Sequence, residues 1–278
     1  MATITVNFMS KSLMRNVTMN VILPVDKFSF TGETQPEATS FKILYLLHGI
    51  FGDHNDWISG TSIKRFAEQR NLAVVMPSGE NMAYLDQEAA QTMYGEFIGR
   101  EMVEITRKMF PLSSKREDTF IGGLSMGGYG ALRNGLKYSD TFSHIIGLSS
   151  AIMTDMLKGM SEVGSSPMFS RSYMETIFGD LDKVEGSDKN PLWTISKLKE
   201  QDAPLPKVFL ACGTSDPLLP TNRKFKESLD NEGIENTYKE GAGAHEWDFW
   251  NRYIEKALDW LPLDSESNAG INSGNVMM

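Results

Sequence analysis

Hydrophobic and polar positions along the chain follow two patterns. The first residues, from Met1 to Phe8, alternate between apolar and polar as in a strand with one buried face. Later runs such as Lys207–Cys212 are short and almost continuously apolar, which is typical of strands buried on both faces. Strands are predicted at Ile4–Met9, Asn16–Leu23, Ile43–His48, Ala73–Pro77, Thr119–Gly123, His144–Leu148, Lys207–Cys212 and Asn236–Lys239. Helices are predicted at Ile63–Gln69, Gly95–Met109, Gly128–Lys137, Asn222–Glu232 and Glu246–Leu261.

The order of these elements predicts an α/β fold. Early strands follow one another and later strands alternate with helices, which indicates a mostly parallel central sheet with an antiparallel N-terminal edge and helices on both faces. A chain of 278 residues is long enough to bury the core of such a domain. Because neither an internal repeat nor an interdomain linker is evident, residues 1–262 are predicted to form a single domain.

Two segments depart from this alternation. Residues 151–200, called the excursion below, separate two consecutive predicted strands by a connection long enough to have a function of its own. It is expected to form either a lid-like cover over a pocket or a helical excursion packed on the flank of the domain. Residues 263–278 are polar and without pattern, and are predicted to be disordered. The apolar residues proposed to cover the pocket are Met153, Met156, Met168, Phe169, Phe178 and Trp193.

Composition narrows the classes of partner. The net charge of −9 argues against nucleic acid and anionic membranes. No apolar run approaches membrane-spanning length, and the N-terminus lacks the pattern of a signal peptide, so a cytoplasmic location is expected. Cys212 is the single cysteine and cannot form an intramolecular disulfide. Neither a C-x-x-C motif nor a histidine pair at ligand spacing occurs, so neither a metal nor a cofactor is expected.

The segment Gly123-Leu124-Ser125-Met126-Gly127 is the first candidate for chemistry. It lies between a predicted strand and a predicted helix. A serine between glycines at such a turn has the form of a nucleophile elbow, which lifts the hydroxyl clear of the sheet. The five-residue pattern is weak alone, because a chain with 24 glycines produces such motifs by chance. The alternative is a glycine-rich turn with an incidental serine.

Chain order selects the histidine that would activate Ser125. In nucleophile-elbow enzymes the order is nucleophile, acid, histidine, which leaves His48 and His54 out of order. His144 lies in a predicted strand too soon after Ser125 to leave room for an acid loop. His245 follows a glycine-rich loop late in the chain, and is predicted to be the general base.

The acid is expected between Ser125 and His245. Asp216 follows the predicted strand Lys207–Cys212, at the sheet edge where open α/β sheets place catalytic groups. A carboxylate there would hold the imidazole in the right tautomer and stabilise its charged form. The competing carboxylates Glu200, Asp202 and Asp230 lie in polar helix or loop contexts. The alternative role of Asp216 is to hydrogen-bond its own turn.

Two backbone amides are expected to form an oxyanion hole. One belongs to Met126, the residue after the candidate nucleophile. The other is expected in the loop after an early strand, and Leu46-Leu47-His48-Gly49-Ile50-Phe51-Gly52 fits that place. Ile50 is the predicted donor, because Gly49 and Gly52 leave room for the backbone to curl toward a substrate.

With these motifs together, the chain resembles the esterase D-like branch of the α/β-hydrolases over roughly residues 1–262. That branch includes S-formylglutathione hydrolases, tributyrin esterases, and the acetylxylan and feruloyl esterases of carbohydrate esterase family 1. The most specific stretches are Leu46–Gly49, Gly52–Trp57, Phe110-Pro111, Gly122–Gly130 and His245-Glu246-Trp247. The resemblance implies the α/β-hydrolase fold and a serine esterase that hydrolyses short acyl esters of a small molecule, among them acetyl or feruloyl esters of plant polysaccharide fragments.

The resemblance also implies residue roles. Ser125, Asp216 and His245 form the triad, and the amides of Ile50 and Met126 form the oxyanion hole. S-Formylglutathione hydrolases usually carry a cysteine shortly after their His-Gly pair. This chain has Phe51-Gly52-Asp53 there, which argues against a glutathione thioester but leaves that thioesterase as the alternative.

Three aromatic residues are candidates for the substrate pocket. Phe51, Tyr84 and Trp247 lie near the motifs in the chain and would accept a cinnamoyl ring, although core packing accounts for them equally well. A non-catalytic binding protein on the same fold is the second alternative, and it would be expected to lack a triad residue. The sequence determines neither the natural ester nor the oligomeric state, and it is compatible with a homo-oligomer.

Overall fold

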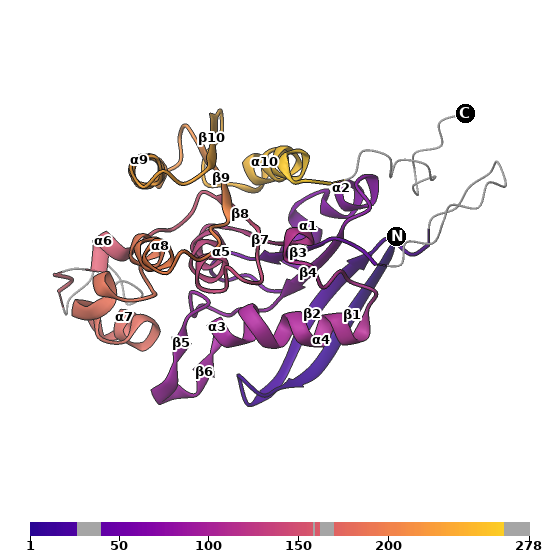
Figure 1. Ribbon diagram of the computed structural model, residues 1–278, viewed down its shortest axis with the longest axis horizontal. Helices are drawn as coiled ribbons and strands as arrows, with labels where there is room; N and C mark the ends of the chain where they lie inside the picture. The colour runs from indigo at the N-terminus through magenta and orange to yellow at the C-terminus, as the bar shows by residue number, and fades with distance from the viewer. Residues whose placement is uncertain (27–39, 158, 162–169, 264–278) are drawn as a thin grey trace.

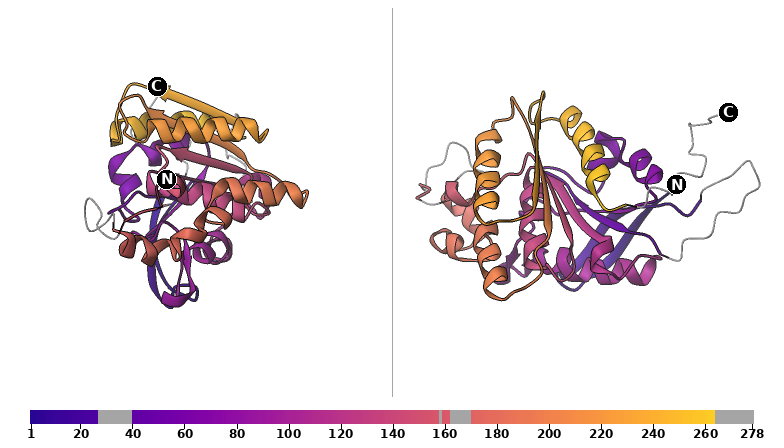
Figure 2. Two further views of the ribbon diagram at one scale, coloured as in Figure 1. Left: turned by 90° about the vertical axis from the view of Figure 1, so that its left-hand side faces the viewer. Right: turned by 45° about the horizontal axis from the view of Figure 1, so that its top comes forward.

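A computed structural model describes residues 1–26, 40–157, 159–161 and 170–263. The architecture is a central eight-stranded sheet between two layers of helices (Figure 1, Figure 2). The strand order is β1-β2-β4-β3-β7-β8-β9-β10, and the β1/β2 and β2/β4 pairs are antiparallel while the others are parallel. The strands are β1 (Ala2–Ser10), β2 (Arg15–Leu23), β3 (Ile43–Leu47), β4 (Ala73–Pro77), β7 (Thr119–Leu124), β8 (His144–Leu148), β9 (Lys207–Gly213) and β10 (Asn236–Gly241). The predicted fold class is confirmed.

Successive side chains of each strand point to opposite faces of the sheet, so the core consists of two hydrophobic clusters, one on each face. In β3, for example, Tyr45 and Leu47 belong to one cluster, whereas Leu44 and Leu46 belong to the other. Every side chain of β3 is buried because both faces are covered. Short helices α1 (Asp56–Gly60) and α2 (Ile63–Gln69) cover one face together with α10 (Trp247–Trp260).

The opposite face is covered by helices from the middle of the chain. They are α4 (Met102–Met109), α5 (Met126–Lys137), α8 (Pro191–Glu200) and α9 (Leu219–Asn231). The predicted helix at 95–109 divides into α3 (Tyr94–Glu96), a π-helical stretch (Phe97–Glu101) and α4. Helix α5 begins directly after Ser125, two residues earlier than predicted. Short 3₁₀ turns lie at Glu88–Ala90, Arg116–Asp118 and Leu181–Gly186.

Two further groups of elements extend this core. A small hairpin pairs β5 (Asp86–Gln87) with β6 (Thr92–Met93). The described part of the excursion contains α6 (Thr154–Leu157), α7 (Arg171–Phe178), one of the 3₁₀ turns and α8, and these helices gather beside α5 (Figure 1). Met168, Phe169 and all of the predicted tail except Leu263 lie outside the described residues. Among the described helices, none combines the length and apolar character needed to cross a bilayer.

Candidate active site

The turn from β7 into α5 holds Ser125 in a strained conformation. Its φ of 52° and ψ of −119° lie outside the regions that residues with side chains ordinarily adopt. The neighbouring glycines explain how the chain permits this turn. A Cβ on Gly123 would lie 2.3 Å from the carbonyl oxygen of Gly127, and a Cβ on Gly127 would lie 2.4 Å from those of Leu47 and His48. The close packing of β7, α5 and the end of β3 therefore requires glycine at both positions.

Side chains from three separate loops meet at this turn. His245 Nε2 lies 3.0 Å from Ser125 Oγ, and His245 Nδ1 lies 2.9 Å from Asp216 Oδ2. The Asp216 side chain has no exposed surface, whereas the imidazole is 30% exposed. The three residues therefore form a continuous hydrogen-bonded chain from a buried carboxylate to the serine hydroxyl. This is the geometry in which a base can take a proton from an alcohol.

Asp216 is held in its ionised form. It lies in the turn after β9, and its Oδ1 accepts a hydrogen bond of 2.8 Å from the backbone N–H of Leu218. Burial alone would raise the pKa of the Asp216 carboxyl, but the hydrogen bonds from His245 and Leu218 outweigh it and hold that pKa below its ordinary value. A carboxylate that accepts from Nδ1–H directs the lone pair of Nε2 toward Ser125.

Trp250 supports the imidazole from the side. Its ring lies edge-on to that of His245, with centroids 4.9 Å apart and an interplanar angle of 89°. The indole Nε1–H donates to Ser149 Oγ at 3.1 Å, which fixes the orientation of the buried ring. Trp250 was not among the predicted site residues. Its position one turn into α10, five residues after His245, is the signal that was available.

The loop after β3 is fixed by His48. The backbone N–H of Gly79 donates to His48 Nε2 at 2.8 Å, so Nδ1 carries the proton and donates to the Gly49 carbonyl at 2.6 Å. Burial lowers the pKa of His48, which keeps the ring neutral and preserves both bonds. His48 thus ties the Gly49–Ile50 loop to the end of β4 and lies outside the relay to Ser125.

Asn81 fixes the same loop from the side of the cavity. Phe51 has a left-handed φ of 66°, and its N–H donates to Asn81 Oδ1 at 2.8 Å. Within the described part of the chain, the N–H groups of Ile50 and Met126 make no hydrogen bond. Both residues line the cavity beside Ser125. Their amides are therefore available to a substrate oxygen, while the Phe51 amide is already engaged.

A cavity of about 330 Å³ opens on Ser125 and His245. The excursion contributes much of its wall, and Met153, Met156 and Phe178 of the predicted covering residues line it. Trp193 lies on α8, where Lys197 stacks over its ring. The described lining is mostly apolar and consists of Ile50, Asn81, Ala83, Ser125, Met126, Tyr129, Ala151, Met153, Met156, Tyr173, Met174, Ile177, Phe178, Pro217, Leu218 and His245.

The structure does not bring the three predicted pocket aromatics to this cavity. Tyr84 is completely buried, and its hydroxyl donates to the His48 carbonyl at 3.0 Å, so it supports the loop from behind. Trp247 packs edge-on against Trp57, and Phe51 is 73% exposed. None of the three belongs to the cavity lining that the described residues form. Nearness to a motif along the chain does not determine where a side chain points.

Comparison with known proteins identifies the family of this chain. The Esterase family, described as "Putative esterase", matches residues 10–261. An acetyl esterase of Caldicellulosiruptor saccharolyticus is 46% identical over 266 residues, which cover 96% of this chain and 100% of that protein.

Two solved structures from Staphylococcus aureus are also similar. The substrate-bound fluorophosphonate-binding serine hydrolase FphF is 30% identical with a TM-score of 0.81, over 94% of this chain and 98% of that one. The S-formylglutathione hydrolase FrmB is 31% identical with a TM-score of 0.79, over the same shares. The chain belongs to the Esterase family and is a carboxylic ester hydrolase with the α/β fold of serine hydrolases.

Proposed function

We propose that Ser125 is the nucleophile of this esterase and that His245 is its general base and acid. Asp216 orients the imidazole and stabilises its positive charge when it is protonated. The observation that carries the proposal is the relay of two hydrogen bonds, 3.0 Å and 2.9 Å long, that joins the three side chains. Each of the three residues follows a different strand. Together they place a carboxylate, an imidazole and a hydroxyl in sequence, which is the arrangement that base-activated acyl transfer requires.

The reaction proceeds in two halves. Ser125 Oγ attacks the ester carbonyl carbon while His245 Nε2 takes the hydroxyl proton, and the carbonyl oxygen becomes an oxyanion facing the amides of Ile50 and Met126. His245 then gives the proton to the departing alcohol as the C–O bond breaks, which leaves an acyl group on Ser125. Water, deprotonated by the same imidazole, attacks this acyl-enzyme. The imidazolium then returns the proton to Ser125 Oγ as the acyl C–O bond breaks and the acid leaves.

We further propose that the preferred acyl groups are short. The cavity of about 330 Å³ is near the lower end of the range for small-molecule sites. Each methylene that fits adds only about 0.8 kcal/mol, whereas one that does not fit costs packing. The relative at 46% identity is an acetyl esterase. Acetylated or feruloylated fragments of plant polysaccharides are the natural esters to test first.

A panel of p-nitrophenyl acetate, butyrate and octanoate, with a feruloyl ester, tests this substrate class. We expect the acetate and butyrate to give the highest kcat/KM, a steep fall by octanoate, and secondary feruloyl activity. A kcat/KM that rises steadily from acetyl to dodecanoyl would contradict the proposal and indicate an open, lipase-like groove. Absence of hydrolysis on every ester would instead favour a non-catalytic binding protein.

Hydrolysis of S-formylglutathione is the second candidate function, because FrmB at 31% identity is named for it. Two observations disfavour it. Phe51-Gly52-Asp53 lacks the cysteine usual in those enzymes. Among the described residues, those that line the cavity include neither a lysine nor an arginine to bind the carboxylates of glutathione. A kcat/KM for S-formylglutathione above that for p-nitrophenyl acetate would reverse this ranking.

A further inference from the structure

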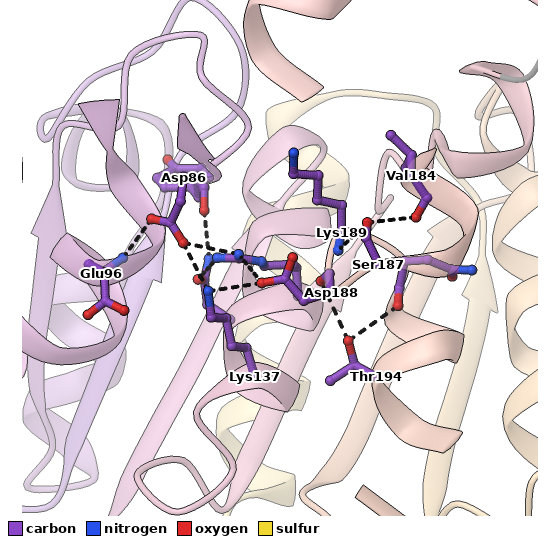
Figure 3. Close-up of polar contacts among 12 residues, drawn as sticks. Asp86, Glu96, Lys137, Val184, Ser187, Asp188, Lys189 and Thr194 are labelled. Atoms are coloured by element: carbon purple, nitrogen blue, oxygen red, sulfur yellow. Dashed lines mark hydrogen bonds and ion pairs between the residues drawn. The ribbon is translucent and has the colours of Figure 1, made fainter. Parts of the chain in front are cut away.

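A cluster of four charged side chains joins helix α5 to the excursion. Arg133, on α5, is 1% exposed, and its Nη2 contacts Asp86 at 3.1 Å and Asp188 at 2.6 Å. Lys137, one turn later, contacts the same two carboxylates at 3.1 Å and 2.9 Å. Figure 3 shows Asp86 and Asp188 directed toward Lys137 from opposite sides. Asp86 comes from β5 and Asp188 from the excursion, so the cluster links three separate segments.

The charges in this cluster balance. Burial would raise the pKa of both the Asp86 and the Asp188 carboxyls, but the neighbouring Arg133 and Lys137 hold these pKa values below the ordinary range. An arginine this deeply buried requires its partners, because a buried charge without one is strongly destabilising. The segment that carries Asp188 is therefore fixed relative to α5. By contrast, the Arg171–Asp182 pair of the excursion is solvated, with Asp182 69% exposed.

Lys189, the residue after Asp188, connects the ion cluster to the wall of the cavity. The Lys189 carbonyl accepts a 2.6 Å hydrogen bond from the Tyr129 hydroxyl, and Lys189 Nζ donates to the Phe178 carbonyl at 2.6 Å. Phe178 is the last residue of α7, where a cation also complements the helix C-terminus. The rings of Tyr129 and Phe178 lie 6.0 Å apart, and both line the cavity. One hydrogen bond therefore joins each of these two wall residues to Lys189, the neighbour of Asp188 in the chain.

We propose that Arg133 and Asp188 are positioning residues that limit the length of the acyl chain by holding Tyr129 and Phe178 in the cavity wall. The inference rests on the proposed function, since it concerns the acyl group bound beside Ser125. A short acyl chain makes little contact with the wall, so its hydrolysis depends mainly on the triad and the oxyanion hole. A long chain presses on the wall, so its hydrolysis depends on whether the wall can recede.

The test is the acyl-length profile of Asp188→Asn, a variant of nearly equal shape that removes one charge. We expect the ratio of kcat/KM for octanoate to that for acetate to rise about tenfold, chiefly through a lower KM for octanoate. Asp182→Asn is the matched control, because it removes a solvated carboxylate from the same excursion. Its ratio should remain within about twofold of that of the wild type.

A second variant protects the test against misfolding of Asp188→Asn. Lys189→Met keeps all four members of the cluster but removes the Nζ bond to Phe178 and the ammonium charge near Asp188, so the same ratio should rise by about threefold. Circular dichroism and thermal unfolding identify the folded variants. An unchanged or lower ratio in the folded variants, or an equal rise in Asp182→Asn, would overturn the inference. Wild-type protein without activity on any ester would overturn the proposed function instead.

Discussion

The two sides of the candidate active site are built in different ways. On the reacting side, Ser125 directly follows β7 and Asp216 lies in the turn after β9, and glycine contacts with neighbouring backbone fix the elbow. On the acyl side, the wall belongs largely to the excursion, which buried ions and single hydrogen bonds attach to α5. The reacting geometry is therefore a property of the fold. Substrate size depends instead on a few long-range contacts that substitution can alter without disturbing the chemistry.

Ser125→Ala breaks the reacting side most severely. Loss of a triad nucleophile costs on the order of a million-fold in kcat, so hydrolysis of p-nitrophenyl acetate should fall to background. Among the described residues the hydroxyl makes one side-chain hydrogen bond, so the thermal midpoint should change little. If the variant retains more than a few per cent of the wild-type kcat, Ser125 is not the nucleophile.

Asp216→Asn should have the second-largest effect, a fall in kcat of about ten-thousand-fold. The amide favours the wrong imidazole tautomer while preserving the shape of the turn. Steady-state kinetics with p-nitrophenyl acetate measure the loss, and Asp202→Asn and Glu200→Gln serve as controls. A comparable loss in either control, with an active Asp216→Asn, would move the acid away from Asp216.

Asn81→Ala tests a residue that lies between the two sides, because Asn81 lines the cavity and also binds the loop that carries the Ile50 amide. Without Asn81 Oδ1, the Phe51 amide loses its acceptor and the loop that carries the Ile50 amide is freed. Direct loss of an oxyanion donor costs roughly a hundred- to a thousandfold, so this indirect change should lower kcat by about tenfold with little change in KM. A changed KM at constant kcat would place Asn81 in substrate binding instead.

A pH titration of stability probes a region remote from both sides. Burial, together with the cations of Lys207 and Arg116, lowers the pKa of His144 from 6.5 to about 4. The unfolded chain therefore binds more protons in this interval, and the free energy of unfolding should fall as pH decreases from 6.5 to 4. In denaturant titrations, His144→Gln should show a shallower fall, and His48 and the carboxyls with lowered pKa values, such as Asp86 and Asp188, account for the fall that remains. An identical slope in the variant would refute the assignment to His144.

Removal of divalent ions should have the smallest effect. In the proposed mechanism the imidazole supplies the base and the two amides stabilise the oxyanion, so kcat/KM after dialysis against EDTA should equal that before. Loss of activity that a divalent ion restores would show that the reacting side is incomplete without a metal.

Sequence patterns predict the reacting side better than the acyl side. Strands β4 and β8 and helix α2 have the predicted bounds, because short apolar runs and helical periodicity are local signals. The motif at the strand-to-helix turn indicated Ser125, chain order indicated His245, and the end of a buried strand indicated Asp216, and the structure brings these three side chains within hydrogen-bond distance.

The remaining features depend on contacts between distant segments. The ion pair between Arg133 and Asp188 joins residues 55 positions apart, and the Phe51–Asn81 bond joins residues 30 positions apart. Neither contact leaves a periodic signal in the chain. The predicted aromatics failed to reach the cavity for the same reason, since tertiary packing directs the ring of Tyr84 behind the loop.

The most direct test of the central claim is the site at which a fluorophosphonate reacts. Such probes phosphonylate a serine only where a neighbouring base activates it. Intact-mass and peptide mapping should place one adduct on Ser125 in the wild type, no adduct in Ser125→Ala, and strongly slowed labelling in Asp216→Asn. An adduct on another residue, or undiminished labelling of Ser125→Ala, would contradict the account.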